Sequence, residues 1–360
     1  MARFVYILMY TRCFASKQRR FGMKAIRISR PGVVEMADIP KPTPRKGEAL
    51  LRPVYGGICG SDLSSYRGTN AYLQYPRIPG HEFSAEVVEI NGEDRGFKPG
   101  DLVTCNPYFN CGSCYSCGRG LVNACMHNET MGVQRDGAFA EYITMPIQRL
   151  IASGGLPAKT LALIEPFCIG RHGIHRADVR KGDTVLVMGA GTIGVLAALA
   201  AKAAGGKVYV SDISEKKLEY AMRFGFAGSL LNRGSESLVQ ETQTLTNGCG
   251  FDVTVEAVGL PSTLQACLDC VAFGGRVAVI GVGKHNIDLD FTVIQKKELN
   301  IFGSRNALTE DFEALIRDVR EQKIDLDGVV TNIYDFSDAP RAFADYDKNA
   351  ADMLKVMLAF

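Results

Sequence analysis

The chain has 360 residues, enough for two domains, and its 41 basic and 39 acidic residues leave a net charge of +2. This near balance argues against the strongly basic surface of proteins that bind nucleic acids or membrane surfaces. The hydrophobic fraction of 46% is that of an ordinary globular chain. We therefore expect a globular, cytoplasmic protein whose partners are small molecules.

Residues 1–22 differ in amino-acid composition from the rest of the chain. The run Phe4–Tyr10 is apolar and is flanked by arginines, but seven residues are too few to cross a bilayer. No clear small-residue cleavage site follows, which argues against a signal peptide. We expect an N-terminal extension here, and an organelle-targeting arm is the alternative.

Residues 23 to about 150 are rich in glycine, proline and short β-prone runs. This texture predicts a strand-rich domain with long loops. The expected strands are Lys24–Ile28, Glu48–Tyr55, Phe83–Ile90 and Leu102–Asn106.

A cluster of four cysteines lies inside this strand-rich region, at C-x2-C-x2-C-x7-C spacing. Four thiolates without another ligand favour a closed, tetrahedral zinc site with a structural role. Disulfides are less favoured because the chain has no secretory segment. An iron–sulfur cluster or a redox thiol pair could use similar spacing, but nothing nearby indicates electron transfer. The predicted structural zinc ligands are Cys111, Cys114, Cys117 and Cys125.

A second set of metal-binding residue types is spread over the same region. A catalytic zinc needs a thiolate, an imidazole and a carboxylate, with one position left open for water or alcohol. Cys59 and the pair His81-Glu82 supply these groups, although each would be unremarkable alone. Ser61 beside Cys59, and Glu165 where the sequence texture changes, strengthen the prediction of an open zinc site.

Beyond about residue 161, apolar strands alternate with helical segments. This order predicts right-handed βαβ units and a parallel sheet. The expected strands are Val185–Met188, Lys207–Ser211, Asp252–Glu256 and Arg276–Ile280, and the expected helices are Ile193–Ala204, Glu215–Phe224 and Thr263–Val271. An amphipathic segment, Phe312–Arg320, and a strand-like run, Met353–Leu358, follow and are expected to return to the first domain.

A Gly-x-Gly-x-x-Gly motif connects the first of these strands to an alanine-rich helix. In this context the glycines permit a tight turn and a close approach to a pyrophosphate, which the helix N-terminus attracts. A glycine turn that packs the helix without any ligand is the alternative. The predicted dinucleotide loop comprises Gly189, Gly191, Thr192, Ile193 and Gly194.

Asp212 ends the next expected strand and predicts the choice of coenzyme. A carboxylate at this place accepts hydrogen bonds from the adenosine ribose and repels a 2′-phosphate, which favours NAD over NADP. Lys216 and Lys217 lie close by and weaken this preference.

In family order, these motifs resemble the medium-chain, zinc-dependent dehydrogenases, in their sorbitol and threonine dehydrogenase branch. The resemblance covers about residues 23–360 and implies an α/β fold with two domains. It implies a GroES-like, β-rich catalytic domain over 23–164 and 306–360, which carries the structural-zinc lobe, and a Rossmann domain with a doubly wound parallel sheet over 165–305. The matching runs are Gly57–Asp62, Pro79–Glu82, Cys111–Cys125, Ile164–Phe167 and Gly189–Gly194.

The resemblance also implies roles for individual residues. Cys59, His81 and Glu82 fall on the catalytic zinc, with Glu165 as a direct or water-linked fourth ligand. Ser61 falls on the hydroxyl that relays the substrate proton. Many relatives carry histidine where this chain has Ser64, so water or the ribose must continue the relay. His172 falls in the helix after Glu-Pro, where packing and chemistry are both open.

The run Gly303–Ala307 resembles sugar-acid members of the family, such as L-galactonate 5-dehydrogenases. Arg305 is the candidate for gripping a substrate carboxylate, with Asn306 beside it. An ordinary surface or subunit-contact arginine is the alternative for Arg305.

We therefore expect hydride transfer from a secondary alcohol of a sugar acid or polyol to NAD, with two zinc ions per chain. Oxidation of an amino alcohol, as by L-threonine 3-dehydrogenases, is the first alternative. A non-catalytic zinc- and nucleotide-binding relative is the second, and the four-cysteine cluster argues against a zinc-free reductase. The resemblance also implies a homo-oligomer, either a dimer or a tetramer.

Overall fold

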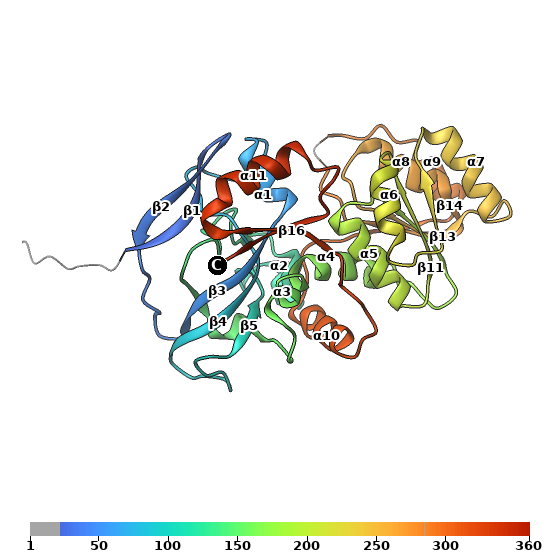
Figure 1. Cartoon of the computed structure of the whole chain (residues 1–360). Helices are drawn as coiled ribbons and strands as arrows, with labels where there is room; N and C mark the ends of the chain where they lie inside the picture. The colour runs from blue at the N-terminus through green and yellow to red at the C-terminus, as the bar shows by residue number, and fades with distance from the viewer. Residues whose placement is uncertain (1–21, 284) are drawn as a thin grey trace, which may run out of the picture.

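The computed structural model describes residues 22–283 and 285–360. The predicted N-terminal extension therefore lies, except for Gly22, outside the described residues. Two units, each built on its own β-sheet, lie next to each other, and helix α4 (Ile164–Arg176) connects the first to the second (Figure 1).

The second unit contains a six-stranded sheet in which every strand pair is parallel. Because β10 is the first strand in sequence and lies in the middle, the strand order reverses between β10 and β13. Such a switch point is where open α/β sheets bind ligands. In sheet order the strands are β12 (Gly228–Leu231), β11 (Lys207–Asp212), β10 (Thr184–Met188), β13 (Phe251–Glu256), β14 (Val271–Val279) and β15 (Asn300–Gly303).

Both faces of this sheet are covered. On β10, Val185 and Val187 pack into one buried cluster with α4 and α5, whereas Leu186 and Met188 pack into another with α8. A continuous apolar run is what a strand buried on both faces requires. The predicted doubly wound α/β fold is confirmed. The remaining helices of this part are α5 (Thr192–Ala203), α6 (Glu215–Met222), α7 (Ser235–Leu245), α8 (Pro261–Cys270), α9 (Thr292–Lys296) and α10 (Thr309–Arg320).

The first unit is built on a seven-stranded mixed sheet. Its order is β16-β17-β3-β4-β5-β9, and β8 also pairs with β3. The strands are β3 (Glu48–Ile58), β4 (Glu82–Asn91), β5 (Leu102–Cys105), β8 (Ile143–Pro146), β9 (Leu150–Ala152), β16 (Val330–Asp335) and β17 (Lys355–Ala359). Two small antiparallel pairs flank it, formed by β1 (Gly22–Arg30) with β2 (Val33–Pro40) and by β6 (Tyr108–Phe109) with β7 (Glu129–Thr130). Its helices are α1 (Gly60–Tyr66), α2 (Tyr115–Gly118), α3 (Ala158–Leu161) and α11 (Ala339–Lys348), with short 3-10 turns at Val122–Ala124, Ile147–Arg149 and Phe336–Asp338.

The C-terminal segment returns to this first sheet, as expected. Strand β17 runs antiparallel to β3, with Val356 opposite Ile58, and Phe343 of α11 packs into the same buried cluster. Helix α10 contacts both units, because it packs against α4 and its first residue, Thr309, accepts a hydrogen bond from Asn106 of the first unit at 3.2 Å. A hydrophobic core therefore continues across residues 305 and 306, and the predicted domain boundaries stay a prediction.

The sequence pattern located four of the six strands of the parallel sheet, but it missed β12, β15 and several elements elsewhere in the described residues. Strand β2 and helices α7 and α11 were not expected, because their apolar residues are interrupted by charged and polar ones. The predicted strand at 353–358 begins two residues later, at Lys355, a buried charge inside an apolar run.

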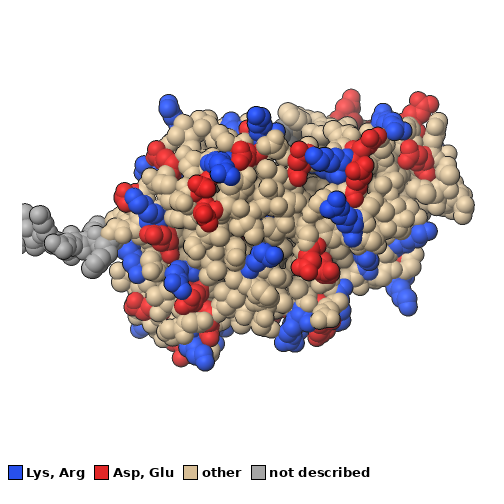
Figure 2. Space-filling model, in the orientation of Figure 1, with Lys and Arg blue, Asp and Glu red and all other residues tan. Residues whose placement is uncertain are grey.

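The charge distribution on the face shown in Figure 2 is mixed, with basic and acidic side chains interleaved over both units. None of the helices within the described residues is long and apolar enough to span a membrane.

Candidate active site and metal centres

Cys59, His81 and Glu82 come together where strand β3 ends and strand β4 begins, in the middle of the first sheet. Cys59 caps α1 directly after β3, and Glu82 opens β4, which pairs with β3 so that Gly57 lies opposite Glu82. One ligand atom from each of the three side chains lies within 4.8 Å of the other two. His81 and Glu82 are buried, and Cys59 is half-buried. The pairing of two strands thus assembles a thiolate, an imidazole and a carboxylate.

Asp62 fixes the two loops that carry these ligands. Its carboxylate accepts the backbone N–H of Cys59 at 2.9 Å and that of Gly80 at 3.4 Å. The side chain is 1% exposed, and burial raises its pKa although His81 opposes the shift. Asp62 therefore holds the Cys59 turn against the residue that precedes His81.

Glu82 is held by Lys355 of β17. The ammonium group donates to Glu82 Oε2 at 2.5 Å and to the carbonyl of Ile58 at 3.2 Å, and Lys355 is 2% exposed. A Cβ atom on Gly57 would lie 2.2 Å from Glu82 Oε2, so only glycine leaves space for the carboxylate here. The second oxygen of Glu82 remains for a metal.

The electrostatics of this cluster suit a divalent cation. Burial alone would lower the pKa of His81, but Cys59, Asp62 and Glu165 raise it well above its ordinary value. His81 Nδ1 and Ser61 Oγ are buried without a hydrogen-bond partner among the described residues. A thiolate, an imidazole and a carboxylate are the ligand types of catalytic zinc, and one position stays open. The residues present therefore fit a catalytic zinc ion.

Glu165 borders this cluster without belonging to it. It lies in the first turn of α4, is 2% exposed, and accepts a short hydrogen bond from the hydroxyl of Tyr108. Burial raises the pKa of Glu165 to about 7, and His81 opposes the shift. The three ligand atoms that lie within 4.8 Å of one another do not include one from Glu165. Its assignment as a direct fourth ligand stays a prediction.

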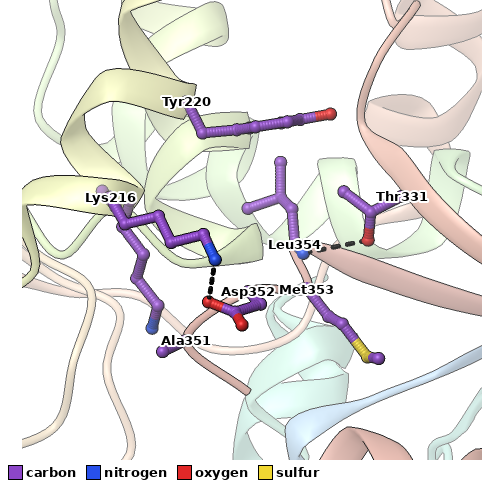
Figure 3. A pocket seen from close by; sticks show the side chains of 9 residues that line it. Lys216, Tyr220, Thr331, Ala351, Asp352, Met353 and Leu354 are labelled. Carbon is purple, nitrogen blue, oxygen red and sulfur yellow. Dashed lines mark hydrogen bonds and ion pairs between the residues drawn. The ribbon is translucent and has the colours of Figure 1, made fainter. Parts of the chain in front are cut away.

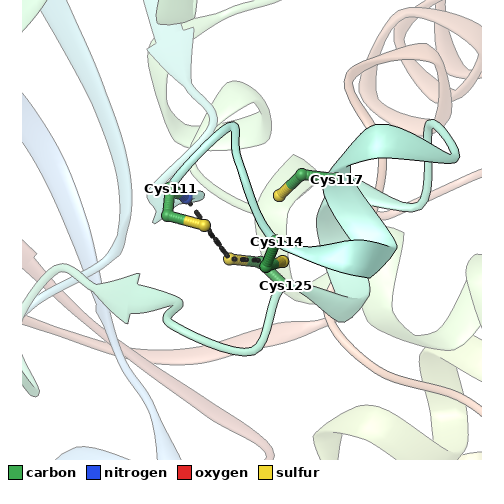
Figure 4. Close-up of side chains that lie close together, drawn as sticks. All are labelled: Cys111, Cys114, Cys117 and Cys125. Carbon is green, nitrogen blue, oxygen red and sulfur yellow. Dashed lines mark hydrogen bonds between the residues drawn. The ribbon is translucent and has the colours of Figure 1, made fainter.

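The four cysteines of the predicted structural site come together on a separate lobe (Figure 4). Cys125 Sγ lies 3.6 Å from Cys111 Sγ and 3.9 Å from Cys114 Sγ, and all four thiols are free. A tetrahedron with Zn–S bonds of about 2.3 Å has edges of about 3.8 Å. Hydrogen bonds from the backbone of Ser113 and Cys114 lower the pKa of Cys111 to about 6. The geometry fits a zinc ion and excludes a formed disulfide among these four.

The lobe is joined to the second unit by a buried polar network. His172 Nδ1 lies 2.9 Å from Asp311, and its Nε2 lies 3.2 Å from the amide of Asn123, two residues before Cys125. Asn123 also donates to the carbonyl of Arg305, and Asn306 donates back to the carbonyl of Asn123. His172 thus has a packing role, whereas the Arg305 side chain is exposed.

The glycine motif forms the turn between β10 and α5. A Cβ atom on Gly194 would lie 1.8 Å from the carbonyl oxygen of Gly189, so helix and strand can approach this closely only with glycine. Gly191 caps α5, and Thr192 donates a short hydrogen bond to the carbonyl of Leu354. Ile193 is half-buried in the first turn of α5.

Asp212 reaches this turn from the end of β11. Its Oδ2 accepts the N–H of Ala190 at 2.8 Å, and its Oδ1 accepts that of Ser214 at 3.0 Å. The carboxylate therefore lies against the glycine loop, as a coenzyme ribose would require.

A narrow cleft of about 40 Å³ opens beside the glycine loop, between α6 and the segment 351–354 (Figure 3). Lys216 of α6 forms an ion pair with Asp352 across it, at 2.7 Å. Lys217 and Tyr220 line the same cleft. The pair places a carboxylate next to one of the two lysines that would otherwise attract a 2′-phosphate.

Comparison with known proteins agrees with this geometry. The description "Alcohol dehydrogenase GroES-like domain" matches residues 45–155, and "Zinc-binding dehydrogenase" matches residues 192–321. An uncharacterised zinc-type alcohol dehydrogenase-like protein of Haemophilus influenzae is 35% identical over 94% of this chain and 99% of its own length. The L-galactonate-5-dehydrogenase of Escherichia coli K12 is 32% identical over 89% of this chain and 94% of its own.

The fold resembles that of solved dehydrogenases. An Escherichia coli alcohol dehydrogenase, rspB, complexed with NADH superposes with a TM-score of 0.87 at 28% identity, over 94% of this chain and 99% of that one. A zinc-binding dehydrogenase from Sinorhizobium meliloti bound to NADP superposes with a TM-score of 0.84 at 27% identity, over 94% of this chain and 99% of that one.

The fold and the two ligand sets define a zinc-dependent oxidoreductase with a GroES-like and a Rossmann unit. The chain belongs to the medium-chain, zinc-binding alcohol dehydrogenase family. Zinc and a nicotinamide dinucleotide are the cofactors of this class, and small-molecule alcohols are its substrates. These predictions are confirmed at the level of the class.

Three residues near the catalytic cluster were not assigned a role from the sequence. Lys355 could have been noticed as a lysine inside an apolar strand, since buried lysines are rare without a partner. Asp62 lay within the matching run Gly57–Asp62, but the pattern gave it no role of its own. Tyr108 gave no signal, because its contact with Glu165 spans 57 positions.

The Cys59→Ala variant tests the catalytic zinc. It should lose one of two zinc ions per chain, and kcat/KM should fall at least about a hundredfold. Loss of a residue that only supports a metal ligand already lowers activity by up to that factor. Metal analysis and coenzyme absorbance measure both effects. Cys249→Ala, a change at an exposed cysteine, is the control. Two zinc ions still bound to Cys59→Ala would refute the assignment.

The Cys114→Ala variant tests the lobe instead. It should lose the other zinc ion and lower the Tm by roughly 5 °C or more, since a structural zinc contributes directly to folding free energy. Differential scanning calorimetry with metal analysis would detect this, and an unchanged Tm would contradict a structural role.

Proposed function

We propose that this protein oxidises a secondary alcohol of a sugar acid or polyol to a ketone, with NAD as hydride acceptor. The observation that carries the proposal is the group of Cys59, His81 and Glu82, whose ligand atoms lie within 4.8 Å of one another. Beside them, Ser61 Oγ is buried and unpartnered among the described residues.

The roles of these residues follow from their chemistry. A zinc ion bound here would act as a Lewis acid that lowers the pKa of an alcohol hydroxyl. Ser61 Oγ would accept the hydroxyl proton and pass it toward water or the coenzyme ribose, since position 64 is not histidine. The glycine loop and Asp212 would hold the coenzyme so that its ring meets the alcohol carbon.

NAD is the proposed coenzyme because Asp212 lies against the glycine loop and Lys216 is paired with Asp352. A 2′-phosphate would meet the Asp212 carboxylate and would have to compete with Asp352 for Lys216. Similar solved enzymes are bound to either coenzyme.

The Asp212→Ser variant should weaken the binding of NAD, because a charged hydrogen-bond acceptor is lost. Its preference for NAD over NADP should fall about tenfold or more. The ratio of kcat/KM for the two coenzymes measures this effect, and Glu219→Ser, an exposed change on α6, serves as the control. Faster turnover with NADP by the unmodified protein would show that Lys217 outweighs the carboxylate.

We favour a sugar acid as the substrate, because Arg305 has an exposed side chain and a backbone carbonyl that is held by Asn123. Asn306 donates its amide to the same lobe, so only its side-chain oxygen remains for a substrate. Amino alcohols are the second candidate substrate class, because L-threonine 3-dehydrogenases are 32–33% identical to this chain. Coenzyme reduction with sugar acids, polyols and L-threonine would discriminate among the three.

The Arg305→Ala variant should raise KM for a sugar acid about tenfold or more, since a guanidinium–carboxylate bond contributes about 1.5–3 kcal/mol. KM for a neutral polyol should not change. Arg320→Ala, an exposed change on α10, is the matched control. A better kcat/KM for polyols that is indifferent to Arg305→Ala would eliminate the sugar-acid proposal.

We also propose a homo-oligomer that forms through the free edge of β15. Among the described residues this strand is the last of the parallel sheet. Ile301 on it is 40% exposed, and Phe291, nearby in sequence, is 74% exposed. Exposed apolar edge strands pair with other chains unless they are blocked. Sedimentation should give a dimer or tetramer that Ile301→Lys weakens, and a monomeric wild type would contradict this proposal.

A further inference from the structure

Tyr108 connects the structural-zinc lobe with the catalytic cluster. It lies on β6, three residues before Cys111, and it is 7% exposed. Its hydroxyl donates to Glu165 Oε1, and both groups are buried. A tyrosine in a core needs a partner for its hydroxyl, and here that partner is the carboxylate beside the catalytic ligands.

The position of Tyr108 is set without help from Glu165. Its N–H donates to Asn106 Oδ1 at 3.0 Å, and Arg149 donates to its carbonyl at 2.5 Å. The other arm of Arg149 donates to Asn110 at 3.0 Å, directly before the first cysteine of the lobe. These contacts hold the backbone of Tyr108, so its phenol reaches Glu165 from a segment that is positioned independently of that carboxylate.

The same helix is held at a second point. Asn123, at the other end of the four-cysteine loop, contacts His172, which follows Glu165 by seven residues. Seven residues are close to two helical turns, so both contacts lie on one face of α4. The lobe thus fixes both the rotation of α4 and the carboxylate that α4 presents.

The consequence concerns the ligand shell. Cys59, His81 and Glu82 form the compact group, and Glu165 stands at its border with one oxygen occupied by the phenol. Hydrogen-bond partners of this kind orient metal ligands and tune the site.

We propose that Tyr108 is a positioning residue of the catalytic site, because its hydroxyl holds Glu165 back from the compact group and leaves the fourth position to water or alcohol. This inference rests on the proposed function in that it takes Cys59, His81 and Glu82 as zinc ligands. Tyr108 itself does not touch the reacting atoms.

The Tyr108→Phe variant removes the hydroxyl and keeps the ring. With Co²⁺ in the catalytic site, its visible absorption spectrum should change, because the freed carboxylate can enter the coordination shell. The half-time of metal release to a chelator should lengthen severalfold, and kcat should fall about tenfold or more, with a smaller change in KM. Tyr334→Phe, which removes a hydroxyl bound to the distant Asp345 carboxylate, is the control.

The outcome in a Glu165→Ala background decides between positioning and packing. If Tyr108 acts through Glu165, Tyr108→Phe should have no further effect on the spectrum or on kcat there. The inference would be overturned if the spectrum and the metal-release half-time were unchanged in Tyr108→Phe alone. It would also be overturned if Tyr108→Phe lowered kcat equally with and without Glu165. Wild-type protein that binds two zinc ions but oxidises none of the alcohols would instead refute the proposed function, and the Co²⁺ spectrum would still test Tyr108.

Discussion

The burial of negative charge at the ends of strands β3 and β4 is the constraint on which the rest of the site depends. Asp62, Glu82 and Glu165 are each at most 2% exposed and lie around a cysteine and a histidine, and the buried Lys355 pairs with Glu82. Removing such groups from water costs several kcal/mol each unless they are compensated. A divalent cation would compensate them, and the coordination chemistry that lowers the pKa of an alcohol would come with it.

The fold supplies this arrangement from distant parts of the chain. Strands β3 and β4 bring Cys59 to Glu82, the last strand contributes Lys355, and α4 contributes Glu165 at the start of the second unit. The C-terminal return is therefore part of the active site as well as of the sheet. The C-terminal segment also contacts the glycine loop, because Thr192 donates a hydrogen bond to the carbonyl of Leu354.

Local patterns sufficed for much of this account. The glycine motif, the cysteine spacing and the apolar runs of the parallel strands depend on contacts over a few residues, and the structure places them as expected. Lys355 and Tyr108 could not be assigned in this way, because their partners lie 273 and 57 positions away. The domain boundary near residue 305 stays a prediction, because the buried cluster that contains Phe312 includes residues of both units.

Zinc X-ray absorption spectroscopy on the purified protein would test the central claim most directly. The account predicts five thiolates shared by two zinc ions, one ion with four sulfur ligands and the other with a single sulfur beside nitrogen and oxygen. Addition of a bound alcohol inhibitor should alter only the nitrogen and oxygen shell. A single zinc ion per chain with four sulfur ligands would contradict the account, because no metal would then remain for the cluster of Cys59, His81 and Glu82.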